Sequence, residues 1–213
     1  MKTQRLMLAA AIAAIAAGCG SLQRSRALND PAVSAPDIAQ QVCSNCHGID
    51  GNSVSPNFPR LAAQQPAYLV AQLTGFRTHH RSDPAGFEYM WGLSRHLSDA
   101  QIQGLADYFA GQKATPNKPG DAVLAARGEE VFKHGVPAKD IPPCQSCHGP
   151  EGQGNGTFPR LAGQHADYVE KQLMVFQRTN ERPEGAVMKT VAHLLTRDNM
   201  VAVANSVQGL APK

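Results

Sequence analysis

One pattern occurs twice in this chain, and it constrains the fold more than any other feature. The second copy follows the first after about 100 residues, which is the size of a small domain. The repeated parts are CSNCHG and CQSCHG (43–48 and 144–149), FPRLA (58–62 and 158–162), Tyr68 and Tyr168, and QL (72–73 and 172–173). The sequence therefore predicts two tandem domains, each with a copy of the same site.

Each copy carries two cysteines and a histidine in the order Cys-x-x-Cys-His. This order is the attachment signal for haem c, because two thiols add to the haem vinyl groups and the adjacent histidine binds the iron. A disulfide, a zinc site or a thioredoxin-like pair uses Cys-x-x-Cys without needing that histidine. The predicted covalent positions are Cys43, Cys46, Cys144 and Cys147, and the predicted iron ligands are His47 and His148.

The sixth iron ligand is predicted to be methionine in both copies. Met90 stands at the same distance before Leu97 as Met188 does before Leu195, so the repeat alignment pairs them. A lone methionine is ordinarily a core residue. Met174 and Met200 have no methionine at the equivalent positions of the first copy, and we interpret them as core residues.

Histidine is the competing candidate for the sixth ligand. None of the other histidines in one copy aligns with a histidine in the other. They are His79, His80 and His96 in the first copy, and His134, His165 and His193 in the second. We therefore interpret each of them as a surface residue or as a residue that supports the site without binding iron.

The FPRLA segments supply candidate supporting residues for both sites. A backbone carbonyl is expected to accept the Nδ1 proton of a metal-bound histidine, and we predict the carbonyls of Pro59 and Pro159 for this role. The alternative is that the prolines only direct the loop. Arg60 and Arg160 either pair with haem propionates or face solvent.

The first residues are typical of a secretory signal peptide, predicted over residues 1–18. Lys2 and Arg5 precede an apolar stretch over residues 6–17, which is too short for a bilayer span of about 20 residues. Small residues then precede Cys19, which is a candidate lipid anchor and membrane tether of a lipoprotein. The alternative is ordinary cleavage nearby. Because Lys2 and Arg5 account for most of the net charge of +3, the mature chain gives no support for a nucleic-acid partner.

Periodicity predicts helices and no sheet. The expected helices lead into Cys43, cover residues 66–77, start at Ser98, follow Asp121, cover residues 166–177 and follow Thr196. The predicted organisation is a flexible tether over residues 19–35, domains over 36–113 and 121–213, and a linker over 114–120. Composition (42% hydrophobic, 17% charged) is that of a globular chain. The fold class is therefore all-α.

Over residues 36–210 the chain resembles the cytochrome c4 family, in both haem motifs, the FPRLA segments, the tyrosines and the methionine positions. It departs from the family at Trp91 and Lys189, which follow the methionines. The resemblance implies two class I cytochrome c domains, each a few helices around one haem. It also implies a periplasmic, often membrane-associated electron carrier between a quinol-oxidising complex and a terminal oxidase.

Two other functions stay open at this point. One is a haem-bearing electron-transfer subunit of a dehydrogenase or oxidase complex. The other is an enzyme, a dihaem peroxidase or thiosulfate dehydrogenase, which would need an iron position open to substrate. Paired methionine ligands argue against the enzyme.

Overall fold

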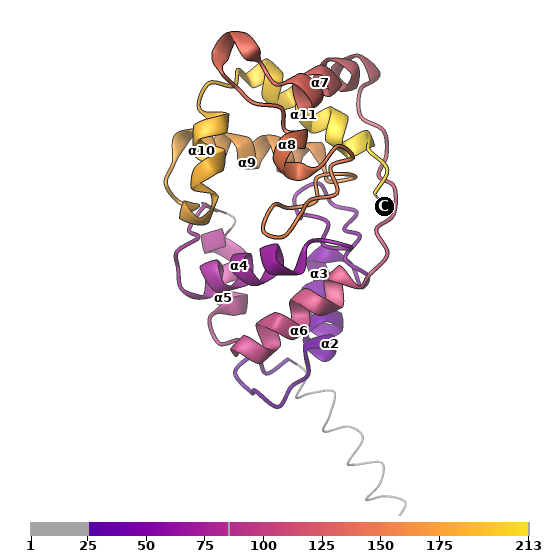
Figure 1. Ribbon diagram of the computed structural model, residues 1–213. Helices are drawn as coiled ribbons and strands as arrows, with labels where there is room; N and C mark the ends of the chain where they lie inside the picture. The colour runs from indigo at the N-terminus through magenta and orange to yellow at the C-terminus, as the bar shows by residue number, and fades with distance from the viewer. Residues whose placement is uncertain (1–25, 85, 213) are drawn as a thin grey trace, which may run out of the picture.

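The chain forms two helical domains joined by an extended segment (Figure 1), in a computed structural model that describes residues 26–84 and 86–212. The N-terminal domain contains α2 (Ala35–Ile38), a π-helical turn (Ala39–Cys43), α3 (Ser44–His47), α4 (Pro66–Arg77), a second π-helical turn (Gly86–Met90), α5 (Trp91–Ser94) and α6 (Asp99–Ala110). The C-terminal domain contains α7 (Ala122–His134), a 3-10 turn (Pro137–Lys139), α8 (Gln145–His148), α9 (Ala166–Arg178), a second 3-10 turn (Pro183–Gly185), α10 (Ala186–Ala192) and α11 (Arg197–Gly209). Within the described residues the only β-pairings are two isolated bridges.

The long helices begin where local capping chemistry places them. The Ser98 hydroxyl accepts a hydrogen bond from the Gln101 amide while the Gln101 side chain accepts one from the Ser98 amide, and Thr196 and Asn199 repeat this capping box. The Asp121 carboxylate accepts hydrogen bonds from the first amides of α7. The expected helices are confirmed, with end points within about one residue. Neither the π-helical turn that carries Met90 nor the short helix that carries Met188 was predicted from the sequence.

Each domain has its own hydrophobic core. In the N-terminal domain α2, α4 and α6 enclose Ile38, Leu69 and Leu105, and in the C-terminal domain α7, α9 and α11 enclose Phe132, Leu173 and Val207. The core of the first domain extends into the segment expected to be a flexible tether.

Val33 is 8% exposed in this core, and Leu28 packs against it. The Gln101 side-chain amide donates hydrogen bonds to the Asp30 and Val33 carbonyls at 3.0 and 3.1 Å. Residues 28–35 are therefore part of the domain, because backbone groups and apolar side chains here are held by α6. The predicted signal peptide and Cys19 lie outside the described residues.

In each domain a glycine allows the first and last helices to cross closely. A Cβ atom at Gly128 of α7 would lie 2.0 Å from the Ala202 carbonyl oxygen of α11. A Cβ atom at Gly104 of α6 would lie 2.6 Å from the Ala35 Cβ of α2. These crossings bring the helix that leads into each Cys-x-x-Cys-His motif against the last helix of its domain.

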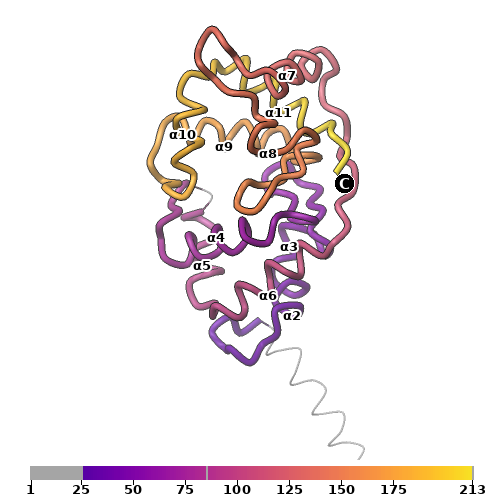
Figure 2. The backbone as a smooth tube through the Cα atoms, viewed as in Figure 1, coloured from indigo at the N-terminus to yellow at the C-terminus, as the bar shows by residue number. Residues whose placement is uncertain are grey.

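The two domains face each other through α4 and α9, and the connection over residues 113–120 runs along one side of the molecule (Figure 2). Hydrogen bonds cross between the domains at several places: Arg182 donates to Gln72 of α4, and Arg81 donates to Gln172 of α9. Within the described residues, no helix combines the length and hydropathy needed to cross a bilayer.

Candidate haem sites

Cys43 ends the first π-helical turn and Cys46 lies in α3, whereas Cys144 caps the start of α8 and Cys147 lies within it. Burial raises the pKa of Cys43 to about 12 and that of Cys144 to about 11. A zinc ligand or a thioredoxin-like cysteine works as a thiolate, which needs a low pKa. In the part of the chain that the structure describes, no cluster of three or more His, Cys, Asp or Glu side chains could hold a metal ion. The raised pKa values of Cys43 and Cys144 therefore disfavour both alternatives.

The histidine of each motif is buried and held by a proline carbonyl. His47 Nδ1 lies 2.9 Å from the Pro59 carbonyl oxygen, and His148 Nδ1 lies 2.9 Å from the Pro159 carbonyl oxygen. Because a carbonyl oxygen only accepts, Nδ1 carries the proton and Nε2 keeps a free lone pair. Burial lowers the pKa of both histidines, although the proline contact opposes the shift. Both imidazoles are therefore neutral and oriented, as an iron ligand must be.

A glycine follows each histidine and turns the chain away from the helix. Gly48 has φ of 80° and Gly149 has φ of 82°, in the region that side-chain-bearing residues rarely adopt. The loop that follows brings Pro59 or Pro159 back over the histidine. This backbone conformation explains why a glycine follows the histidine in both copies of the motif.

Aromatic rings connect the histidine of the first domain to the segment that carries Met90. The Phe58 ring lies 6.2 Å from the His47 ring and 6.3 Å from the Tyr89 ring, in edge-to-face contacts. Phe158 repeats the contact with His148 at 6.2 Å. Met90 ends its π-helical turn, and its carbonyl accepts a hydrogen bond from the Ser94 hydroxyl at 2.7 Å. The loop and the methionine segment thus meet at one side of His47.

Met188 lies within α10 and packs against the core of the C-terminal domain. The residues after α10 are held by the Gln177 side chain, which donates to the carbonyls of Ala192, His193 and Leu195. Met200 is 1% exposed and lies inside the core, which confirms its interpretation as a core residue. Met174 packs against the same core. The assignment of Met90 and Met188 as ligands stays a prediction.

Arg60 and Arg160 do not face solvent, so that alternative is wrong. They are 5% and 2% exposed, and they lie between the two domains. The Arg60 amide donates to Gln164 Oε1 at 2.8 Å, and the Arg160 amide donates to Gln64 Oε1 at 2.6 Å. Each glutamine also donates to the carbonyl of the same arginine at 3.1 Å. The contact between the domains therefore buries both arginines. The same pair of hydrogen bonds occurs twice in it, once with the arginine from each domain.

The arginine side chains provide a test of whether these sites fit haem. The Nε atoms of Arg60 and Arg160 are buried, and they have no hydrogen-bond partner among the described residues. Burial lowers the pKa of Arg160 to about 10, and the neighbouring charge of Arg60 adds to the effect. A buried cation with an unpaired N–H is costly. A haem propionate would supply the missing negative charge and acceptor, so the arginines fit the group.

Exposed apolar side chains give a second test. Most of the large apolar residues exposed to solvent flank the predicted ligands in sequence. They are Ile49 and Val54 after His47, Phe87, Tyr89 and Leu93 around Met90, Phe158 before Pro159, and Val187 and Leu194 around Met188. A large apolar macrocycle at each site would cover such residues. The donor set, the arginines and the apolar surroundings therefore agree with haem.

His165 makes a contact between the domains that the repeat does not show. It is 6% exposed, so it is not a surface residue. Its Nε2 lies 2.9 Å from the Ser53 carbonyl oxygen of the other domain, and its Nδ1 lies 3.2 Å from the Asn117 side-chain nitrogen of the linker. Sequence reasoning looked for histidines shared by both copies, and His165 has no counterpart. The other five histidines outside the two Cys-x-x-Cys-His motifs are exposed.

Comparison with known proteins gives consistent matches over both domains. The family model for cytochrome c matches residues 33–113 and 125–210. The chain is similar to cytochrome c4 of Pseudomonas aeruginosa, with 40% identity over 173 residues (79% of this chain and 84% of the relative). It is similar to a thiosulfate dehydrogenase electron acceptor of Thiomonas intermedia, with 34% identity over 188 residues (85% and 84%).

A solved structure shares both the fold and the sequence pattern. It is the crystal structure of reduced recombinant cytochrome c4 from Pseudomonas stutzeri, with a TM-score of 0.73 and 37% identity. The match covers 83% of this chain and 99% of that one. The likeness therefore extends over both domains together.

Proposed function

Because the chain belongs to the cytochrome c4 family, and so carries two covalently bound haem c groups, we propose that it is a respiratory electron carrier. In this proposal it takes electrons from a quinol-oxidising complex and passes them toward a terminal oxidase. One observation supports the proposal above others. Both domains hold a buried, neutral histidine on a proline carbonyl at 2.9 Å, so the two sites are built for the same task.

The proposed roles of the residues follow from their positions. Cys43, Cys46, Cys144 and Cys147 hold the two haems as thioethers. His47 and His148 bind iron through Nε2, and Pro59 and Pro159 fix the ring orientation. Met90 and Met188 would supply the second protein ligand to each iron. Arg60 and Arg160 offer their unpaired Nε–H groups to propionates.

Each haem, when bound, supplies one reversible one-electron step. The protein's part is to hold both axial ligands in place so that little has to move when the charge changes. An iron with two protein ligands has no position for peroxide or thiosulfate, and we therefore propose a carrier and not an enzyme. Two sites in one chain allow two electrons to be carried per molecule.

Location is part of the proposal. The apolar leader over residues 1–18 supports export, and we place the mature protein in the periplasm. Cys19 is proposed as its lipid-modified N-terminus and membrane tether. Mass spectrometry of the mature N-terminus tests this directly, because an unmodified N-terminus that lacks Cys19 would exclude the anchor.

A second function has specific support. The relative from Thiomonas intermedia is named a thiosulfate dehydrogenase electron acceptor, and its match covers 85% of this chain. The alternative proposal is that this chain receives electrons from such a dehydrogenase, or serves as the haem-bearing subunit of a dehydrogenase or oxidase complex. The residues at the two haems would act in the same way, and only the donor would differ.

The test is an anaerobic redox titration followed by reconstitution with membranes. We expect two low-spin haems with the weak far-red sulfur-to-iron absorption in the oxidised state. Quinol-dependent reduction by membranes, followed by oxidase-dependent reoxidation, would support the respiratory route. Reduction only by thiosulfate dehydrogenase and thiosulfate would favour the alternative. A high-spin haem with turnover of peroxide or thiosulfate by the purified protein would overturn the carrier proposal.

A further inference from the structure

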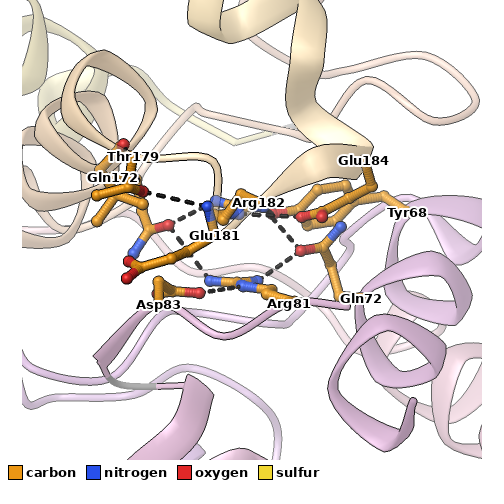
Figure 3. A network of polar contacts seen from close by, with 10 residues as sticks. Tyr68, Gln72, Arg81, Asp83, Gln172, Thr179, Glu181, Arg182 and Glu184 are labelled. Atoms are coloured by element: carbon orange, nitrogen blue, oxygen red, sulfur yellow. Dashed lines mark hydrogen bonds and ion pairs between the residues drawn. The ribbon is translucent and has the colours of Figure 1, made fainter. Parts of the chain in front are cut away.

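A buried polar network joins the two domains at a distance in sequence from both Cys-x-x-Cys-His motifs (Figure 3). We propose that this network positions both methionine segments at once, so that the hold on the axial methionine of one domain depends on side chains of the other. The inference rests on the proposed function in one respect, the assignment of Met90 and Met188 as iron ligands.

Two glutamines and two arginines form the centre of the network. Gln72 Oε1 accepts hydrogen bonds from Arg81 Nη1 at 2.5 Å and from Arg182 Nη2 at 2.7 Å. Gln172 Oε1 accepts from Arg182 Nη1 at 2.5 Å and from Arg81 Nη2 at 3.3 Å. Each glutamine thus holds the arginine of its own domain and that of the other domain. Figure 3 shows both guanidinium groups between the two amide oxygens.

The backbone joins the same two places. The Ser82 amide, which follows Arg81, donates to the carbonyl of Glu181, which precedes Arg182, at 2.9 Å. The segments that run from the arginines to the methionines therefore start side by side.

Arg81 is also the anchor of the segment that ends in Met90. Its Nε donates to Asp83 Oδ1 at 2.8 Å, and its guanidinium lies over the Phe76 ring at 4.4 Å. The Asp83 carbonyl accepts from the Phe87 amide at 2.9 Å, inside the turn that ends in Met90. A Cβ atom at Gly86 would lie 2.7 Å from Phe76, so this turn sits directly on the anchored ring.

Arg182 holds the start of the Met188 segment in the same way. Its Nε donates to Glu184 Oε1 at 3.0 Å, its guanidinium lies over the Phe176 ring at 4.5 Å, and its carbonyl accepts from the Gly185 amide at 3.0 Å. α10 begins at the next residue and contains Met188. The path from Gln72 to Met188 is therefore short and runs through packed groups.

The burial of the arginines makes the link strong. Arg81 and Arg182 are 5% and 6% exposed, so water does not readily replace a lost acceptor. An arginine stays charged in a protein, and a charged donor without its acceptor has to move. The bond that Arg182 donates to Gln72 (2.7 Å) is shorter than the bond that Arg81 donates to Gln172 (3.3 Å). Substitution of Gln72 should therefore affect Met188 more strongly than substitution of Gln172 affects Met90.

The experiment measures how easily each methionine is displaced by imidazole in the full-length oxidised protein. The proton resonances shifted by each iron report the two haems separately, and Met90→Ala and Met188→Ala assign them. In Gln72→Leu, which removes the shared acceptor, we expect both methionines to be displaced at about fivefold lower imidazole concentration. Gln72→Glu keeps acceptor oxygens at this position and should stay within about twofold of the parent.

Two matched control variants separate a shared network from ordinary loosening of one domain. Arg77 Nη1 donates to the Leu97 carbonyl at 2.9 Å, and Gln177 Nε2 donates to the Leu195 carbonyl at 2.9 Å, each within its own domain. Arg77→Leu should therefore weaken only Met90, and Gln177→Leu should weaken only Met188. Circular dichroism and haem content establish that each variant is folded.

Arg182→Lys supplies a second route if Gln72→Leu does not fold. It keeps the charge but removes the fork that spans both glutamines. We expect imidazole to displace Met90, in the other domain, at a concentration at least about twofold lower than in the parent protein. The decisive value is the imidazole concentration that displaces the methionine of the opposite domain, Met188 in Gln72→Leu and Met90 in Arg182→Lys. If that concentration matches the parent protein in whichever variant folds, the proposal is overturned. Absence of methionine signals in the parent protein itself would instead refute the ligand assignment.

Discussion

Gln64 holds the backbone of Arg160 from the opposite domain, and its removal has a calculable cost. Gln64 is 4% exposed, its Oε1 accepts from the Arg160 amide at 2.6 Å, and its Nε2 donates to the Arg160 carbonyl at 3.1 Å. Gln64→Leu leaves one buried N–H and one buried carbonyl without these partners. Each unsatisfied group costs about 1–3 kcal/mol, so we expect a loss of about 2–6 kcal/mol in the stability of this contact.

Amide hydrogen exchange measures the effect at the site itself. A loss of about 2 kcal/mol makes the protected Arg160 amide exchange roughly thirtyfold faster, since 1.4 kcal/mol is tenfold. The Arg60 amide, held by Gln164, is the internal reference and should change much less. Because Arg160 follows Pro159, whose carbonyl orients His148, the reduction potential of the C-terminal haem should also shift.

Gln65→Leu is the matched control for this prediction. Gln65 is the next residue, and its side chain makes one half-buried interdomain hydrogen bond, from Nε2 to the Gln153 carbonyl at 2.9 Å. Its loss should cost about 0.5–1.5 kcal/mol. If Gln64→Leu left the exchange of the Arg160 amide unchanged, or changed it no more than Gln65→Leu does, the reasoning from buried unpaired groups would be refuted.

Three further predictions follow from features described above. Burial lowers the pKa of His165 from 6.5, so this histidine binds a proton more readily in the unfolded chain than in the folded protein. The free energy of unfolding should therefore fall as the pH drops below about 6.5. A series of thermal melts across this pH range should show a smaller fall in His165→Gln. Gly128→Ala places a Cβ atom 2.0 Å from the Ala202 carbonyl oxygen and should cost about 1–3 kcal/mol by calorimetry, whereas Gly209→Ala, with nothing within 4 Å, should not destabilise the protein. Met90→Ala and Met188→Ala should each remove about half of the far-red sulfur-to-iron absorption and together remove all of it; a band that survives in the double variant would contradict the ligand assignment.

The parts of the fold that depend on neighbouring residues could be predicted from the sequence. Ser98 and Thr196 cap helices with side chains three residues away, so the pattern is local and visible. The contacts of Pro59 and Pro159 with the histidines follow from ligand chemistry and a repeated loop of nearly constant length. In each of these cases the partners lie within about a dozen residues.

The parts that depend on how the domains meet could not be predicted. Arg160 and Gln64 are separated by 96 residues, and nothing local to either one indicates the other. Residues 28–35 have the polar and proline-containing composition of a tether. The hydrogen bonds from Gln101 and the packing of Leu28 and Val33 place them on the domain. The helix that carries Met188 has seven residues, which is too short for periodicity to reveal.

The connection over residues 113–120 has a consequence for how the two halves stay together. The contacts between the domains include many hydrogen bonds, each worth only about 0.5–1.5 kcal/mol net, and separate domains would have to offset the loss of free motion on association. A short linker converts that association into an intramolecular event with an effective concentration in the millimolar range. Arg60 contacts Thr115 of the linker and the Gly163 carbonyl, so the linker is itself part of the contact between the domains. The spacing between the two iron sites is therefore fixed at any dilution of the protein, and a single cut in this segment would make that spacing depend on concentration.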